Sequence, residues 1–232
     1  ALDIAPFALG SDTGGSIRQP ASFNGVFGMK PTYGMSSRYG VIAMASSTDV
    51  MGCFARSAED VALIESVMAG QDPRDMTTLP DYFEAKEKIA PGQRIGLITE
   101  TMGEGVDKDV RAVVNDYVER LRTAGHTVEE VSMPSVKYAL AIYYIVVPAE
   151  VSSNLARYDG IRYGRRAEGA KTLAELYGRS RAEGFVTENK RRIMIGSYVL
   201  SSGFFDAYYL QAQKARTLLI NEFNALFGPV SY

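Results

Sequence analysis

The feature that most constrains this chain is a turn rich in glycine and hydroxyl residues that directly follows a short apolar segment. Residues 4–9 are predicted to form a buried strand, and the turn, Gly-Ser-Asp-Thr-Gly-Gly-Ser over residues 10–16, begins where they end. Paired glycines such as Gly14 and Gly15 let backbone N–H groups converge without obstruction by a Cβ, and converging N–H groups can stabilise an oxyanion. Ser16 follows them directly, where a nucleophile would stand. The turn therefore predicts acyl-transfer chemistry.

The general base is not identified by these residues. His126 is the one histidine of the sequence, in a predicted turn between a helix and a strand, and a Ser-His-Asp triad could use only that residue. A lone histidine in a turn is far more often solvated than catalytic. We therefore expect a base other than histidine, or a base outside this chain.

Other interpretations of the glycine turn have weaker support. A phosphate loop of the Walker type needs Gly-Lys-Ser/Thr, and no lysine follows Gly15. Aspartic proteases carry the tripeptide Asp12-Thr13-Gly14, but they pair two such loops and this chain has one. The alternative without catalysis is a strand-to-helix turn capped by Ser16. Composition alone does not decide between that turn and a nucleophile.

Longer motifs carry a resemblance that covers essentially the whole chain. It includes the element Asp-Thr-Gly-Gly-Ser-Ile-Arg-x-Pro and several later stretches, namely residues 12–20, 23–34, 37–40, 150–164, 190–196, 206–209 and 213–216. These residues resemble the amidase signature family. The later stretches resemble in particular the family branch that supplies the glutamine-hydrolysing subunit of tRNA-dependent amidotransferases.

The resemblance implies roles for the turn. Ser16 matches the family's nucleophile, which forms an acyl ester, within a triad of serine, cis-serine and lysine. Thr13, Gly14 and Gly15 would supply the N–H groups of the oxyanion hole. Arg18 follows the nucleophile by two residues, and we predict that it forms a buried pair with Asp12 that braces the turn rather than contacting substrate.

The resemblance also implies a glutamine pocket. Arg192, in Lys-Arg-Arg-Ile-Met, matches the residue that would bind the substrate carboxylate, for which a guanidinium offers bidentate hydrogen bonds. The alternative is a solvated helix face, since the segment is a run of charges. Tyr143 resembles a tyrosine that lines the same pocket, with ordinary helix packing as the alternative.

Members of this branch imply partners and a larger protein. The bridging serine and the lysine precede the glycine turn in the family, so we expect an interior fragment, truncated at both ends and inactive by itself. The complete protein would hydrolyse glutamine and pass ammonia to a B subunit, which uses ATP and magnesium to amidate Glu-tRNA(Gln) or Asp-tRNA(Asn), while a C subunit wraps around it. This chain itself would bind no cofactor and would meet tRNA only through the complex.

Two alternatives remain open, and local departures bear on them. One is a stand-alone hydrolase of small amides, and the other is a non-catalytic remnant or scaffold. Asn24, Val50 and Cys53 stand where the family pattern has Cys, Gln and Pro. The change to Val50 falls near the pocket in that pattern and leaves room for a different amide substrate.

Composition sets the remaining expectations. At 232 residues the chain is predicted to form a single α/β amidase domain over residues 1–232. A net charge of −2 gives no overall attraction to nucleic acid or membrane. A single cysteine fits a reducing cytoplasm, and we expect it to be buried rather than reactive. One His and one Cys cannot form a zinc site, and no membrane-spanning segment is predicted.

Hydrophobic periodicity predicts a mixed β-sheet flanked by helices. A helix should begin at Ser57 and bury Val61, Leu63, Ile64 and Val67, and a polar loop should cover residues 71–91. Strands at residues 94–98 and 127–131 should flank an amphipathic helix over 106–123. Helices are expected at 138–158, 172–182 and 187–227, the last interrupted at two glycines, Gly196 and Gly203. Missing flanks should leave an apolar patch exposed and cause self-association.

Overall fold

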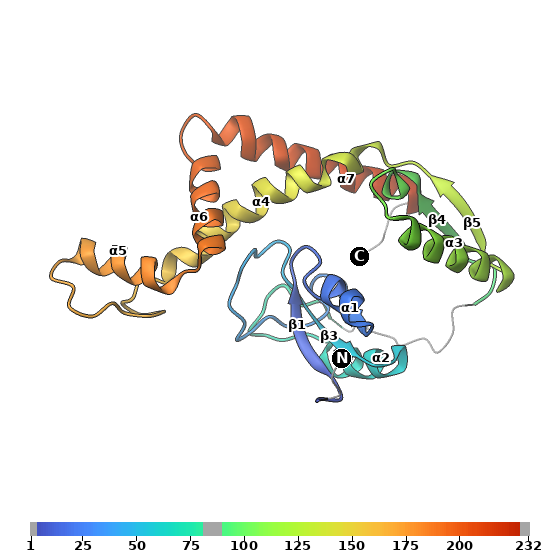
Figure 1. Ribbon diagram of the computed structural model, residues 1–232, viewed down its shortest axis with the longest axis horizontal. Coiled ribbons are helices and arrows are strands. Elements are labelled where there is room, and N and C mark those ends of the chain that lie inside the picture. Colours follow the sequence, from blue (N-terminus) through green and yellow to red (C-terminus); the bar gives the residue numbers. More distant parts are fainter. Residues whose placement is uncertain (1–3, 81–89, 228–232) are drawn as a thin grey trace. The chain divides into compact units, whose positions relative to one another are not determined.

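The chain forms two compact units, each assembled from two separate stretches of sequence. The computed structural model describes residues 4–80 and 90–227. Within them, residues 4–80 and 145–204 form the first unit, and residues 90–144 and 205–227 form the second. The elements of both are shown in Figure 1. The single domain over residues 1–232 stays a prediction.

The first unit contains a three-stranded antiparallel sheet in the order β1-β3-β2. Its strands are β1 (Ala8–Asp12), β2 (Phe27–Met29) and β3 (Val50–Ala55), with α1 (Arg18–Asn24) between the first two. The prediction of a buried strand over residues 4–9 is corrected in two ways: β1 runs through the glycine turn's first residues, and Phe7 and Leu9 are 49% and 60% exposed. Gly10 pairs with Gly52, and a Cβ on Gly10 would lie 2.9 Å from the Phe54 ring. Asp12, which ends β1, pairs with Val50.

Helix α2 (Ala58–Met68) begins where the sequence predicted, but it turns a different face inward. The Ser57 hydroxyl accepts a hydrogen bond from the Asp60 N–H at 3.0 Å, which confirms the predicted cap. Leu63 and Val67 are 65% and 80% exposed, whereas Glu65 is buried. The periodicity identified the helix and misplaced its buried face, because a charged residue at the core-facing position could not be anticipated from polarity.

An apolar groove lies between β1 and α2, and it corresponds to the predicted exposed patch. Its volume is about 650 Å³. The side chains that line it are mostly apolar and include Phe7, Leu9, Leu63, Val67 and Met68. Exposed apolar surface of this kind favours association, although the predicted self-association itself stays a prediction.

The second unit contains a parallel pair of strands joined by a helix. Strands β4 (Arg94–Ile98) and β5 (Thr127–Val131) pair in parallel and have the predicted bounds. Helix α3 (Lys108–Thr123) connects them, beginning two residues later than predicted with the Asp107 side chain as its cap. The molecule is therefore α/β, with its antiparallel and parallel strands in separate sheets in the part of the chain described.

The helical half of the chain is more divided than predicted. Helices α4 (Ala139–Asn154), α5 (Leu173–Gly184), α6 (Thr187–Val199) and α7 (Leu210–Phe227) replace the three predicted helices, and short 3₁₀ helices (Pro134–Tyr138, Leu155–Arg157) flank α4. The prediction of one interrupted helix over 187–227 is corrected to two helices. The chain turns at Gly203, whose φ is +86°, and a π-helical turn (Phe205–Tyr209) leads into α7.

Gly196 has a packing role instead of kinking its helix. A Cβ at this position would overlap the Pro148 carbonyl oxygen of α4. The glycine therefore permits close approach of α6 to α4 in the first unit. Val147, Ala149 and Val151 of α4 are buried there as well.

One helical segment of the described chain, Pro134–Arg157, is long and apolar enough to cross a membrane by length and composition. The same properties occur in the core helices of globular proteins. Residues 146–149 within it are buried in the structure, which is the position of a core helix. A fraction of the 71–91 loop, residues 81–89, lies outside the described residues.

Candidate active site

The glycine turn is organised around the buried carboxylate of Asp12 at the end of β1. This carboxylate accepts hydrogen bonds from the N–H groups of Gly15 at 2.6 Å and Ile17 at 3.2 Å, and from the Arg18 backbone at 3.4 Å. The Arg18 guanidinium donates two further hydrogen bonds, from Nε to Oδ2 and from Nη2 to Oδ1, both at 3.1 Å. Asp12 is completely buried, and the Arg18 side chain is half exposed. The pair thus joins the strand end to the first turn of α1.

The charges around Asp12 favour its ionised form. Burial alone would raise the pKa of the Asp12 carboxyl, but the hydrogen bonds from Arg18, Gly15 and Ile17 outweigh it and hold the pKa at about 2. The hydrogen bond to Asp12 raises the pKa of Arg18. Burial lowers the pKa of Lys30, and repulsion from Arg18 adds to this effect while Asp12 opposes it. Asp12 is therefore an anchor for the turn and a poor proton acceptor.

Ser16 lies exposed between this anchor and α1. Its neighbour Gly15 has a φ of +129°, a region that side chains rarely occupy, and a Cβ there would meet no atom within 4 Å. Glycine is therefore required by the backbone and not by crowding. The helix begins after Ile17 with no side-chain cap. The alternative in which Ser16 caps the helix is thus wrong, because the Arg18 N–H is bonded to Asp12 and the Gln19 N–H to the Gly15 carbonyl at 2.8 Å.

The three predicted oxyanion donors differ in their surroundings. The Gly15 N–H is directed at Asp12, so a contribution from Gly15 would require this bond to be shared or released. The Thr13 hydroxyl donates to Asp49 at 2.7 Å. The roles of Thr13, Gly14 and Gly15 toward an oxyanion stay predictions, as does that of Ser16 as nucleophile.

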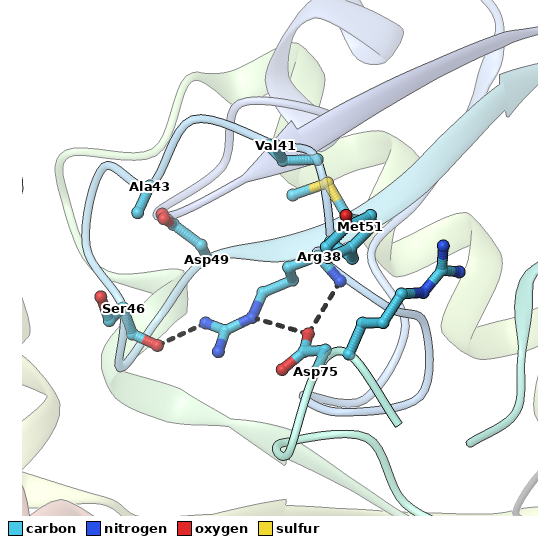
Figure 2. A pocket seen from close by; sticks show the side chains of 9 residues that line it. Arg38, Val41, Ala43, Ser46, Asp49, Met51 and Asp75 are labelled. Carbon is cyan, nitrogen blue, oxygen red and sulfur yellow. Dashed lines mark hydrogen bonds and ion pairs between the residues drawn. The ribbon is translucent and has the colours of Figure 1, made fainter. Parts of the chain in front are cut away.

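A cavity of about 210 Å³ lies beside Asp49, the residue that accepts the hydrogen bond from Thr13 (Figure 2). Asp49 and Met51 line it, and Met51 pairs across the sheet with Ser11 of β1. On another side of the cavity, the Arg38 guanidinium donates to the Ser46 carbonyl at 2.5 Å and to Asp75 at 3.4 Å, as Figure 2 shows. Burial acts to raise the pKa of Asp75, but hydrogen bonds from Thr77 and from the Arg38 amide lower it to about 2.

The predicted substrate residues lie on two helices. Arg192 is in α6 with its side chain 20% exposed, and its Nε donates to Glu188 Oε1 at 2.9 Å. This bond is the main cause of a lowered pKa for Glu188. Tyr143 is half-buried in α4, and its ring meets the ring of Tyr144 edge-on, with 5.3 Å between the ring centroids. Tyr143 belongs to the second unit, whereas Arg192 and Ser16 belong to the first, so a common pocket stays a prediction.

The sequence offered two further candidates for a reactive side chain, Cys53 and His126. Cys53 is completely buried, and burial together with the nearby Glu65 raises the pKa of its thiol to about 12. The predicted burial of Cys53 is confirmed, and a thiol with a raised pKa is expected to be poorly nucleophilic. His126 lies in the second unit, with a buried Nδ1 that has no hydrogen-bond partner among the described residues.

The positions that depart from the family pattern differ in their contact with the turn. Val50 is buried opposite Asp12 in the sheet, and Cys53 pairs with Leu9. Asn24 ends α1 and donates from Nδ2 to the Pro20 carbonyl at 2.8 Å. Val50 alone of the three is the strand partner of the residue that anchors the turn. In residues 4–80 and 90–227 no group of three or more His, Cys, Asp or Glu side chains could hold a metal ion.

Several residues near the turn were not predicted. Asp49 and Lys30 were given no role from the sequence, although Lys30 lies in the stretch 23–34 that carries the resemblance, and both become neighbours of the turn only through the fold of the first unit. The only local signal was the run Ser-Ser-Thr-Asp before an apolar strand, a composition typical of side chains that bond nearby backbone.

The structure thus places an exposed serine on a glycine turn of an α/β scaffold, with the turn held by the buried Asp12 and the half-exposed Arg18, which is the arrangement on which the prediction of acyl transfer rests. The comparisons with known proteins agree with this prediction. The family described as Amidase matches residues 1–231, and the chain belongs to this family.

Within this family, the chain is similar to several individual proteins. The chain is 51% identical over 234 residues to the A subunit of glutamyl-tRNA(Gln) amidotransferase from Sulfurihydrogenibium sp. (strain YO3AOP1), with 99% of this chain and 48% of the relative covered. The crystal structure of the corresponding protein from Thermotoga maritima matches with a TM-score of 0.72 and 35% identity, over 96% of this chain and 44% of that one. A peptide amidase from Stenotrophomonas maltophilia matches with a TM-score of 0.61 and 26% identity, over 90% and 44%. The chain spans about half the length of the curated relatives it matches.

Proposed function

We propose that this chain carries the nucleophile of the glutamine-hydrolysing subunit of a tRNA-dependent amidotransferase. The observation that carries the proposal is the exposed Ser16, on a turn fixed by Asp12. The chain that contains it has 51% sequence identity to a subunit of that enzyme. The similarity continues through the segments around Arg192 and Tyr143, beyond the turn itself.

In the proposed reaction, Ser16 Oγ attacks the side-chain amide carbon of glutamine. The carbonyl oxygen becomes an oxyanion, for which Thr13, Gly14 and Gly15 are the predicted donors, with the Gly15 N–H also bonded to Asp12. The proton removed from Ser16 is returned to the amide nitrogen, so that collapse of the intermediate expels ammonia and leaves a γ-glutamyl ester on Ser16, which water then hydrolyses to glutamate and free Ser16. Arg192 would bind the substrate carboxylate, exchanging its bond to Glu188 for one to substrate.

The proton of Ser16 needs an acceptor. Asp12 has too low a pKa for this purpose, and Arg18 carries a raised one. We assign the base to the lysine that the family resemblance implies, acting through a bridging serine. Loss of general-base catalysis costs about 10²–10⁴-fold, so these residues alone are expected to turn over slowly.

The remaining steps belong to partners in this proposal. Ammonia passes to a B subunit that uses ATP and magnesium to amidate Glu-tRNA(Gln) or Asp-tRNA(Asn), and a C subunit wraps around the glutaminase. The chain's net charge of −2 agrees with contact to tRNA through the complex only. A single buried thiol is compatible with a cytoplasmic location.

A second candidate is a stand-alone hydrolase of small amides. The observation in its favour is Val50, buried against Asp12 where the family branch has a polar residue, together with the likeness to a peptide amidase. A non-catalytic scaffold is the third candidate, and it predicts no dependence of any reaction on Ser16.

Substrate preference distinguishes these candidates. Ammonia release by the complete gene product that carries this sequence, isolated with its co-purifying subunits, is compared for glutamine, asparagine and simple aliphatic amides. Ser16→Ala removes the nucleophile, and Ser22→Ala makes the same change at an exposed position on α1. Preference for glutamine that is lost only in Ser16→Ala supports the proposal. Preference for simple amides supports the second candidate, and equal rates in all variants support the third.

A further inference from the structure

We propose that Asp49 is a positioning residue for the nucleophile turn, held in place by Glu150 and Asn154 of α4. The inference rests on the proposed function, because it assigns these residues an effect on the Ser16 reaction. All of them belong to the first unit.

Asp49 joins the turn to the loop that precedes β3. Its Oδ1 accepts a hydrogen bond from the Thr13 hydroxyl at 2.7 Å, and its Oδ2 accepts from the N–H groups of Met44 at 2.8 Å and Ala45 at 3.0 Å. The side chain is buried, with 6% of Asp49 exposed. A buried carboxylate with three donors has little freedom to reorient, so Thr13 is tied to a rigid loop.

Helix α4 fixes this loop from the other side. Glu150 accepts from the Ser47 N–H at 2.9 Å and from the Ser47 hydroxyl at 2.5 Å. One helical turn later, Asn154 donates from Nδ2 to the Met44 carbonyl at 3.2 Å. Residues four apart lie on the same helix face, so Glu150 and Asn154 both bind the same loop from one side of α4. The chain of contacts runs from α4 to the loop, then through Asp49 to Thr13.

The position of Thr13 in the turn gives these contacts a catalytic consequence. Asp12 holds the turn from Gly15 onward, and Asp49 holds it at Thr13. Gly14 lies between these two attachments, and of the three predicted oxyanion donors Thr13, Gly14 and Gly15, the Gly15 N–H is already bonded to Asp12. Loss of one such donor costs about 10²–10³-fold in kcat, and misplacement by about 1 Å costs about 10²-fold. Asp49 would act through Thr13 without touching substrate.

The test compares variants that disturb the attachment of Thr13 to the loop in the complete gene product, isolated with its co-purifying partners. Thr13→Val and Asp49→Asn are each expected to lower kcat for glutamine about 10²-fold, with KM changed by less than about threefold. Thr13→Ser keeps the hydroxyl and should retain most of the activity. The double variant should be no slower than the slower single variant, because both changes disturb the same attachment: Thr13→Val removes the donor, and Asp49→Asn replaces one of the two oxygens that accept from Thr13 and from the Met44 and Ala45 amides.

A matched control is available in another loop of the same unit. Thr78 is 7% exposed, and its hydroxyl accepts from the Asp72 N–H at 2.9 Å and donates to the Asp75 carbonyl at 2.8 Å. Thr78→Val therefore removes equivalent hydrogen bonds away from the turn. Its kcat should stay within about twofold of wild type.

The proposal is overturned if Thr13→Val retains wild-type kcat, or if Thr78→Val slows the reaction equally. If Asp49→Asn does not fold, Thr13→Val decides, because it changes one half-buried hydroxyl. If wild type shows no Ser16-dependent hydrolysis of glutamine, the proposed function fails, and the same variants are compared by the rate at which a fluorophosphonate labels Ser16. A similar decrease in labelling still supports the positioning role, and equal rates overturn it.

Discussion

The ion pair between the buried Asp12 and the half-exposed Arg18 leads to a quantitative prediction about stability. The pKa of Asp12 is about 2 in the folded chain against an ordinary value of 3.8. A difference of about 1.8 units corresponds to about 2.4 kcal/mol at neutral pH. Because the Arg18 guanidinium is half exposed and screened by solvent, we reduce this to about 2 kcal/mol. Asp12→Asn should lower the unfolding free energy of the first unit by at least that amount.

The pH dependence of this contribution has a definite sign. A carboxyl whose pKa is depressed on folding stabilises the protein above its unfolded pKa, and this stabilisation is lost as pH falls through the folded value. The difference between wild type and Asp12→Asn should therefore be constant from about pH 7 to pH 5 and shrink between about pH 4 and pH 2.

Urea unfolding at a series of pH values, followed by circular dichroism, measures this difference. Asp60→Asn, an exposed position on α2, serves as the control and should change stability by less than about 0.5 kcal/mol. An Asp12→Asn variant as stable as wild type at neutral pH would refute the reasoning. A difference that grows on acidification would refute it equally.

Other predictions concern packing and surface, and each uses the thermal midpoint unless another measurement is named. Gly196→Ala should destabilise the protein by about 3 kcal/mol, because the new Cβ would overlap the Pro148 carbonyl. The control is Gly178→Ala in α5, where a Cβ meets no atom within 4 Å, and it should be neutral or stabilising by up to about 1 kcal/mol. Equal effects of the two changes would contradict the close approach of α6 to α4. Burial raises the pKa of Glu65 above its ordinary 4.5, so this carboxyl should make wild-type stability fall as pH rises from about 4.5. Glu65→Leu should raise stability at pH 7 by about 1–3 kcal/mol and remove this pH dependence. A destabilised Glu65→Leu variant would contradict the prediction. Val67→Glu places a charge in the apolar groove and should reduce self-association in sedimentation velocity; unchanged association would exclude the groove as the contact.

Much of the local structure was predictable because local rules govern it. The Ser57 cap, the bounds of β4 and β5, and the glycine turn after a strand all depend on neighbouring residues. The site's centre was predictable for the same reason, since Asp12 and Arg18 are six residues apart and meet within one turn.

The rest depends on contacts between distant parts of the sequence. Glu65 faces inward on α2 and Val67 outward, because the packing of the first unit and not polarity decides which helix face is covered. Asp49 reaches Thr13 across 36 residues, and Glu150 reaches Ser47 across 103. No periodicity or motif encodes such pairings, so the residues that hold the turn were not predicted together with the residues that form it.

The central claim, that Ser16 is an acyl-accepting nucleophile, is tested most directly by intact mass spectrometry during glutamine hydrolysis by the complete gene product, with ammonia release measured in parallel. The account predicts a γ-glutamyl adduct that maps to Ser16, and loss of both adduct and ammonia in Ser16→Ala but not in Ser22→Ala. Glutamine turnover that persists in Ser16→Ala, or an adduct on another residue, would contradict it.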